Sequence, residues 1–142
     1  MTLSNFHVRN ISSLSILVFG VLALALGLIG LIRPETMLQL LGFEVLDRAN
    51  RVNGDFTVTF LTASSMASFN MGVYYVLAAL TNTRQFYVWT VPFRVVTFIV
   101  FTLAVVRGFA PVGFIGVAVW ELVGALFTGA ALWYEGRKVA ST

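Results

Sequence analysis

The chain has 142 residues, of which 58% are hydrophobic and only 11% are charged, and its mean hydropathy is +0.90. A soluble domain of this length could not bury so much apolar surface, so the composition indicates a helical integral membrane protein. The nine Lys and Arg residues are scattered and form no basic run, so the net charge of +3 does not indicate binding to nucleic acid.

The chain lacks the residues of the common metal and thiol sites. It has no cysteine, and its one histidine, His7, falls in a polar N-terminal tail where we expect it to be solvated. Disulfides, thiol nucleophiles, cysteine zinc sites and imidazole relays inside the fold are therefore excluded. We expect neither a metal nor a cofactor.

Four stretches are long enough to cross the roughly 30 Å core of a bilayer as helices. They cover about residues 11–32, 56–80, 86–106 and 112–134, and they predict an all-α bundle of four transmembrane helices in a single domain, residues 1–142. The first stretch is too long for a signal-peptide core and has no evident small-residue cleavage site, so we expect it to be retained. The last three follow one another closely, which predicts antiparallel neighbours.

The long connection between the first two spans contains a short predicted helix. Pro34 suits a first helical position and Gly42 a helix end, so Pro34–Leu41 is expected to form a helix at the membrane interface. With four spans, both termini lie on one side of the membrane. The two sides carry equal numbers of Lys and Arg residues, so the positive-inside rule favours neither orientation. The acids of the connection all lie opposite the termini, which favours cytoplasmic termini. These acids, expected to be solvated, are Glu35, Glu44, Asp47 and Asp55.

Two charged residues fall inside predicted spans. Glu121 is the only charge in Val112–Tyr134, and a span that began after Arg94 would keep only twelve residues, too few to cross. Counted from the loop side at 1.5 Å per residue, Glu121 lies about 14 Å deep and Arg94 about 18 Å deep. We therefore predict an Arg94–Glu121 ion pair. The alternative for Arg94 is snorkelling to the nearer membrane surface, past a kink at Pro92.

Hydroxyl-bearing residues of the second span lie at the same depth as this pair. Ser68 or Asn70 is predicted to complete the hydrogen bonds that a buried ion pair requires. Small residues at helical spacing, such as Gly27 in the first span and Gly72 in the second, predict close helix packing. Aromatic residues near the span ends predict an interfacial belt. These are Tyr87, Trp89, Trp133 and Tyr134.

A carboxylate at this depth is either half of a structural pair or a functional group. A carboxylic acid in an apolar site can protonate an alkene or an epoxide without a metal or a thiol. One hypothesis is therefore a membrane-embedded enzyme in which Glu121 and Arg94 are the catalytic residues. The side chains expected to contact its lipophilic substrate are Ser64, Ser68, Asn70, Tyr74 and Trp120.

Two other functions fit the same residues. A proton-coupled small transporter would need a polar cavity open to water, whereas the enzyme would have a mostly apolar pocket beside Glu121. A non-catalytic accessory or assembly protein would have a closed ion pair and a groove for a partner. The expected partners are the lipid bilayer and a lipophilic small molecule, and the composition leaves homo-oligomerisation open.

One stretch resembles a known group of proteins. Residues Leu22–Phe43 (LALALGLIGLIRPETMLQLLGF) comprise a glycine-rich span, a proline after its exit and a short helix ending in LGF. With a hydroxyl-rich second span and a fourth span rich in small residues, this layout resembles the DoxX-like group of small four-helix membrane proteins. The resemblance implies a four-helix bundle and no catalytic residue. Small membrane proteins of this shape occur in natural-product pathways, which suits acid/base isomerisation or cyclisation.

Overall fold

The computed structural model describes residues 8, 10–45, 50 and 52–140, and every regular element in these ranges is helical. In chain order the elements are α1 (Ile11–Ile32), α2 (Pro34–Leu40), α3 (Thr57–Thr81), α4 (Arg84–Val106), the 3-10 turn η3 (Val112–Phe114) and α5 (Ile115–Ala140). The predicted all-α class is confirmed. Within the described ranges, three helices are long and apolar enough to cross a membrane, namely α1, α4 and the stretch Val112–Lys138. The predictions for His7 and Asp47 concern residues outside these ranges.

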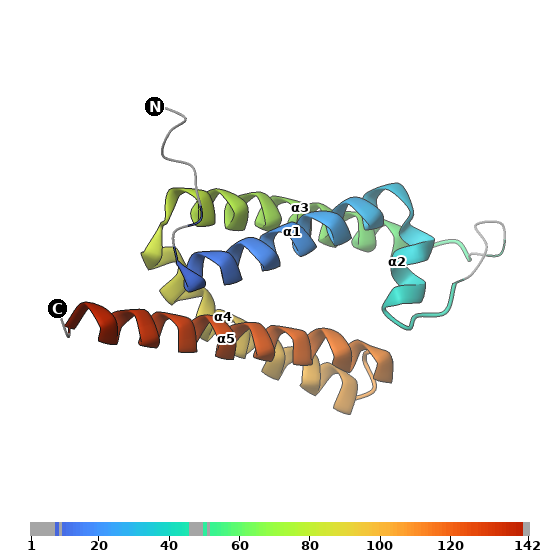
Figure 1. Cartoon of the computed structure of the whole chain (residues 1–142). Coiled ribbons are helices and arrows are strands. Elements are labelled where there is room, and N and C mark those ends of the chain that lie inside the picture. Colours follow the sequence, from blue (N-terminus) through green and yellow to red (C-terminus); the bar gives the residue numbers. More distant parts are fainter. Residues whose placement is uncertain (1–7, 9, 46–49, 51, 141–142) are drawn as a thin grey trace.

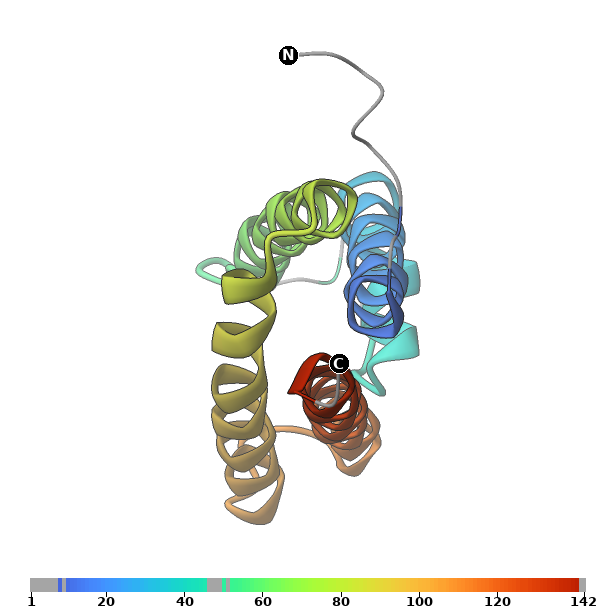
Figure 2. The ribbon, with the colours of Figure 1, turned by 60° about the vertical axis from the view of Figure 1, so that its left-hand side comes forward.

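The long helices are arranged as two antiparallel pairs. α1 packs on α3, α4 packs on α5, and the pairs are joined chiefly where α1 meets α5. α1 begins and α5 ends at the same end of the bundle, and α2 lies at the other end (Figures 1 and 2). The prediction that α3 and α4 pack side by side is wrong, because these consecutive helices diverge after the turn that joins them.

Glycines explain why α3 pairs with α1. A Cβ on Gly27 would overlap the backbone of Ser65 and Phe69, and a Cβ on Gly72 would overlap the facing turn of α1. Without these side chains the two backbones approach closely, and such contact drives association in lipid, where burying apolar surface gives no advantage. The predicted packing role of Gly27 and Gly72 is confirmed.

α2 follows α1 after a single residue. Pro34 occupies its first position, and Gly42 has a φ of +78° just past its end. Proline suits a helix start, and glycine adopts the left-handed conformation that commonly ends a helix. A helix is present at the predicted place, although it ends at Leu40 rather than Leu41, and its position at a membrane interface stays a prediction.

Polar residues fasten the start of α1 to α4 and α5. Glu135 on α5 accepts hydrogen bonds from the N–H of Ser12 at 2.8 Å, from its hydroxyl at 2.8 Å, and from Arg84 at 2.9 Å. The carboxylate thereby pairs with a free N–H in the first turn of α1, where the helix dipole favours negative charge. Asn10 caps α1, and its side-chain amide donates to Asn82 Oδ1 at 3.2 Å. One network thus ties α1 to the other long helices at this end.

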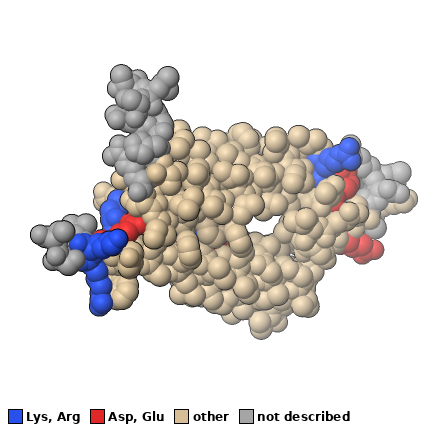
Figure 3. Space-filling model, in the orientation of Figure 1, with Lys and Arg blue, Asp and Glu red and all other residues tan. Residues whose placement is uncertain are grey.

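Charged side chains gather at the two ends of the bundle. The broad middle of the face in Figure 3 carries none, whereas blue and red side chains lie at either end. Such an uncharged band between charged ends is typical of a helical protein in a bilayer. Arg84, Glu135 and Arg137 belong to the end where α5 finishes, and Arg33 and Glu44 to the end with α2.

The aromatic residues near the helix ends behave in two ways. Trp133 and Tyr134 are exposed, and the guanidinium carbon of Arg137 lies 4.0 Å from the centroid of the Trp133 ring. Tyr87, by contrast, is fully buried, and its hydroxyl donates to the carbonyl of Ala78 at 3.0 Å. The predicted belt position is therefore wrong for Tyr87, which packs in the core because its hydroxyl has a partner there.

Candidate functional site

Arg94 lies in the middle of the bundle and contacts both helices of the other pair. Its side chain is only 4% exposed, so the alternative of snorkelling to the membrane surface is wrong. Its guanidinium carbon lies 3.6 Å from the centroid of the Phe19 ring on α1 and 5.3 Å from that of Tyr75 on α3. Aromatic rings attract a cation placed over them, and the attraction is strongest where water is excluded.

Glu121 on α5 is the acidic partner of Arg94. Its Oε2 lies 3.7 Å from Arg94 Nε, so the predicted ion pair is confirmed. At this distance the two charges attract each other, but they share no hydrogen bond. The side chain of Glu121 is 23% exposed, against 4% for Arg94, so the carboxylate lies at the edge of the buried layer.

Gly124 makes room for the guanidinium. A Cβ at this position would overlap Arg94 Nη1 and the edge of the Phe19 ring. Gly124 follows Glu121 by three residues and therefore lies on the same side of α5. This side of α5 thus supplies both the carboxylate and the space into which the arginine fits.

The hydrogen bonding of the ion pair is incomplete within the described part of the chain. Arg94 Nε and Nη1 are buried and donate to no acceptor there. The prediction that Ser68 or Asn70 completes the network is wrong. The Ser68 hydroxyl donates to the carbonyl of Ala23 on α1 at 3.0 Å, and Asn70 is exposed. The reason is that α3 packs on α1, which brings a backbone carbonyl of α1 within reach of the Ser68 hydroxyl.

A cavity of about 370 Å³ opens between the two helix pairs, on the α2 side of Arg94 and Glu121. Its walls come from all the helices and are largely apolar, with the hydroxyls of Ser64, Ser65 and Ser68 on one side. In Figure 3 the molecule is hollowed next to α2, between the upper and lower helix pairs. The cavity is therefore reachable from the surface.

The ion pair lies beyond the inner end of this cavity, and neither Arg94 nor Glu121 is among the residues that line it. Val117 lines the cavity, and Glu121 comes four residues later on the same face of α5. One helical turn advances about 5.4 Å along the axis, so the carboxylate lies just beyond the last lining residue of α5. The walls of the cavity itself are therefore apolar side chains and serine hydroxyls, without a charged group.

The residues predicted to contact a lipophilic substrate lie on different faces of their helices, and only some of them line the cavity. Ser64 and Ser68, which are four residues apart, both line the cavity. Asn70 and Tyr74, also four apart, share a different face of α3 and are exposed. Trp120 is 40% exposed, and its ring packs against the aromatic ring over which Arg94 lies.

Two residues of the site were not singled out from the sequence. Phe19 is an aromatic residue in an apolar helix, and nothing in the sequence distinguishes it from other packing residues. Gly124 carries a weak signal, because a small residue one turn from a buried charge can accommodate a large partner.

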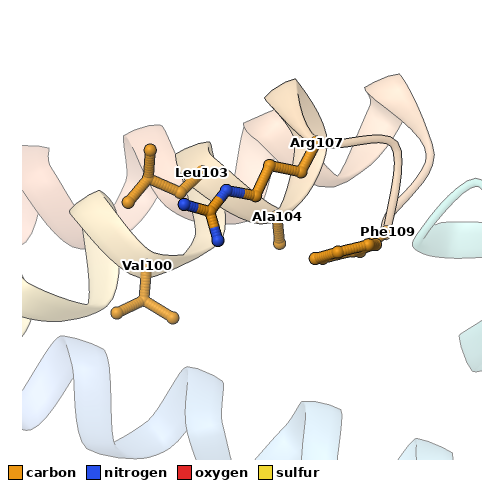
Figure 4. Close-up of a pocket in the computed structure, with 5 residues that line it drawn as sticks. All are labelled: Val100, Leu103, Ala104, Arg107 and Phe109. Atoms are coloured by element: carbon orange, nitrogen blue, oxygen red, sulfur yellow. The ribbon is translucent and has the colours of Figure 1, made fainter.

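A second hollow lies on α4 at its loop end (Figure 4). It measures about 250 Å³ and is lined by Val100, Leu103, Ala104, Arg107 and Phe109. The Arg107 side chain extends back along α4, beside Leu103. An arginine above apolar walls is typical of a helix end that meets lipid. The residues that line this hollow include no acid and no hydroxyl that could act as a catalytic group.

Comparison of the chain with protein-family models, curated proteins and solved structures gives no match. The function proposed for the protein therefore rests on the geometry of the site.

Proposed function

We propose that this protein is a four-helix transmembrane protein that binds a lipophilic small molecule in the cavity between its two helix pairs. The cavity carries the proposal. Its volume of about 370 Å³ falls within the range of small-molecule sites, and its walls are largely apolar with a few polar groups. A lipophilic ligand could enter it directly from the bilayer. The apolar walls favour binding over proton-coupled transport, which would require a polar path.

In this proposal α3 is the fourth span. It has 25 residues, which corresponds to about 37 Å of helix, and it packs along α1. Its hydroxyls suit a lipid environment because several donate back to their own helix. Thr62 donates to the carbonyl of Val58 at 2.8 Å and Ser64 to that of Leu61 at 2.9 Å. The termini then share the cytoplasmic side, as the acids of the long connection favour, and α2 lies at the opposite interface. Four spans also agree with the four-helix bundle that the resemblance to the DoxX-like group implies.

The absence of cysteine makes this topology easy to test. Asn53 precedes α3 and Thr83 follows it, and both are exposed. Asn53→Cys and Thr83→Cys are to be labelled with a membrane-impermeant maleimide in right-side-out vesicles. We expect labelling of Asn53→Cys only, until the membrane is permeabilised. Labelling of both variants from one side would exclude α3 as a span. Labelling of Thr83→Cys alone would show that the orientation is the opposite of the one proposed.

Ligand binding can be tested by filling the cavity. Gly116 lines it, and a Cβ there would meet no atom within 4 Å, so Gly116→Leu occupies empty space. Gly136, on the same helix, has equally free space and lies outside the cavity, so Gly136→Leu is the matched control. Each protein is purified in mild detergent and its organic extract is analysed by mass spectrometry. We expect one lipophilic compound to accompany the wild type and Gly136→Leu and to be largely lost from Gly116→Leu. Equal extracts from all three would refute the proposal.

The same extracts decide whether the ligand is also transformed. Glu121→Gln keeps the shape of the side chain and removes its capacity as a general acid or base. If the protein only binds, Glu121→Gln carries the same compound as the wild type or less of it. Accumulation of a different, related compound on Glu121→Gln would assign a catalytic role to Glu121.

A further inference from the structure

We infer that the ligand of the cavity is an uncharged lipophilic compound with an oxygen that accepts a hydrogen bond from the hydroxyl of Ser65. This inference rests on the proposed function, because it names the chemistry of the ligand in the same cavity.

Ser65 lines the cavity and has an unused hydroxyl. The residue is 4% exposed, and its hydroxyl takes part in no hydrogen bond among the residues that the structure describes. In the same ranges, the fully enclosed side-chain atoms without a partner belong to Arg94 and Thr102. The oxygen of Ser65 therefore borders open space, and the open space that this residue lines is the cavity.

The two other serines of the cavity wall have already donated their protons. The Ser64 hydroxyl donates to the carbonyl of Leu61 at 2.9 Å, and the Ser68 hydroxyl donates to that of Ala23 at 3.0 Å. A serine hydroxyl has one proton, so these two oxygens can only accept a further hydrogen bond. Among the described residues of the wall, Ser65 is thus the hydroxyl that is free to donate. A buried donor without an acceptor is unfavourable, so a ligand that supplies an acceptor is favoured.

Helix packing holds the Ser65 hydroxyl in one place. A Cβ on Gly30 of α1 would overlap the Ser65 oxygen, and it would lie 3.6 Å from Met37 of α2, which also lines the cavity. The oxygen therefore lies where α1, α2 and α3 meet, in space that Gly30 leaves open. A donor fixed between packed helices can select where the polar group of a ligand lies.

The remainder of the wall favours an apolar, uncharged molecule. Across from α3, the wall is formed by side chains such as Phe101, Phe114 and Val117, which offer no polar group. The described residues that line the cavity include no Lys, Arg, Asp or Glu. An ionised group placed among apolar side chains without a partner is unfavourable. An apolar body with one acceptor oxygen on the side that faces α3 matches this arrangement.

A competition experiment with defined probes tests the inference. Tritiated dodecan-2-one is bound to the purified full-length protein in detergent and displaced by unlabelled compounds at equal mole fraction in the micelles. The competitors are dodecan-2-one, which accepts a hydrogen bond, dodecane, which has no polar group, and the charged dodecanoate and dodecylammonium. The net gain from one hydrogen bond corresponds to roughly three- to tenfold in affinity, so we expect dodecan-2-one to compete better than dodecane by about that factor. Both charged compounds should compete poorly.

The neighbouring serines provide matched variants. Ser65→Ala removes the free donor, whereas Ser64→Ala removes a hydroxyl that donates to its own helix. We expect the preference for dodecan-2-one over dodecane to disappear in Ser65→Ala and to persist in Ser64→Ala. Should Ser65→Ala not fold, Ser65→Cys replaces the hydroxyl with a weak donor and should lose most of the preference. A preference that survives the loss of the Ser65 hydroxyl, or that Ser64→Ala loses equally, would overturn the inference.

The outcomes also separate this inference from the proposed function. If the wild type binds dodecan-2-one and dodecane equally while Gly116→Leu loses both, the inference is overturned and the proposed function stands. The exact mass of the compound that co-purifies should include an oxygen, and a hydrocarbon, an acid or an amine there would also overturn the inference. If no probe binds and no compound co-purifies, both proposals fail.

Discussion

The guanidinium carbon of Arg94 lies 3.6 Å from the centroid of the Phe19 ring, and this contact joins the two helix pairs at the middle of the bundle. It links α4 to α1 through a charge lying over an aromatic ring. Such a contact gains strength where water is excluded. Glu121 on α5 supplies the opposite charge that neutralises the guanidinium. The packing of the two helix pairs at this level therefore depends on the side chain of Arg94.

Enlarging Gly124 should displace Arg94. A Cβ there overlaps both the guanidinium and the Phe19 ring, so we expect Gly124→Ala to lower the free energy of unfolding by about 1–3 kcal/mol. Gly129→Ala is the control, because its Cβ would lie 3.6 Å from Val91, an ordinary contact. Thermal unfolding in detergent measures both. Equal stability of the two variants would show that the site around Arg94 is looser than described.

Removing one member of the ion pair should harm the protein more than removing both. Arg94→Leu leaves the carboxylate of Glu121 without its partner at 3.7 Å, and breaking a buried pair typically costs about 3–5 kcal/mol. Combining Arg94→Leu with Glu121→Leu should restore much of the stability, because no unpaired charge remains. A double-mutant cycle of unfolding free energies measures the coupling. A double variant no more stable than Arg94→Leu alone would contradict a direct interaction.

Glu135→Gln should loosen the start of α1. The carboxylate of Glu135 accepts from Ser12 and Arg84, and its charge lies at the positive end of the α1 dipole. We expect a loss of about 1–2 kcal/mol in unfolding free energy, smaller at high salt. Glu44, which is exposed, provides the control Glu44→Gln, expected to be near neutral. Equal effects of the two changes would argue against this role for Glu135.

Tyr87→Phe should cost about 1 kcal/mol, because it deletes one hydrogen bond in the core and leaves the Ala78 carbonyl without that donor. Tyr74 has the same side chain but is 56% exposed, so Tyr74→Phe should leave unfolding unchanged. Chemical unfolding of the two variants in parallel checks the difference. If Tyr74→Phe proves the more damaging, Tyr74 has a role that its exposure does not reveal.

The Arg94–Glu121 pair could be predicted because depth in a membrane is a one-dimensional quantity. Each helix advances by a fixed rise per residue, so counting from a common surface places both charges at nearly the same level. Because a charged side chain is unfavourable in lipid, two opposite charges at the same depth are expected to contact each other. The roles of Ser68 and Asn70 could not be predicted in this way, because depth says nothing about the direction in which a side chain points.

The sequence by itself determined the helical class, the extents of the long helices within a few residues, and the uncharged band between charged ends. These properties follow from composition and from the regular rise of a helix, which are local. Only the tertiary structure decided that α3 pairs with α1 and α4 with α5, and hence that a cavity lies between the pairs. Periodicity states which residues share a face of one helix. Which other helix covers that face depends on the fit of distant surfaces, here on glycines such as Gly27 and Gly72 that let two backbones meet.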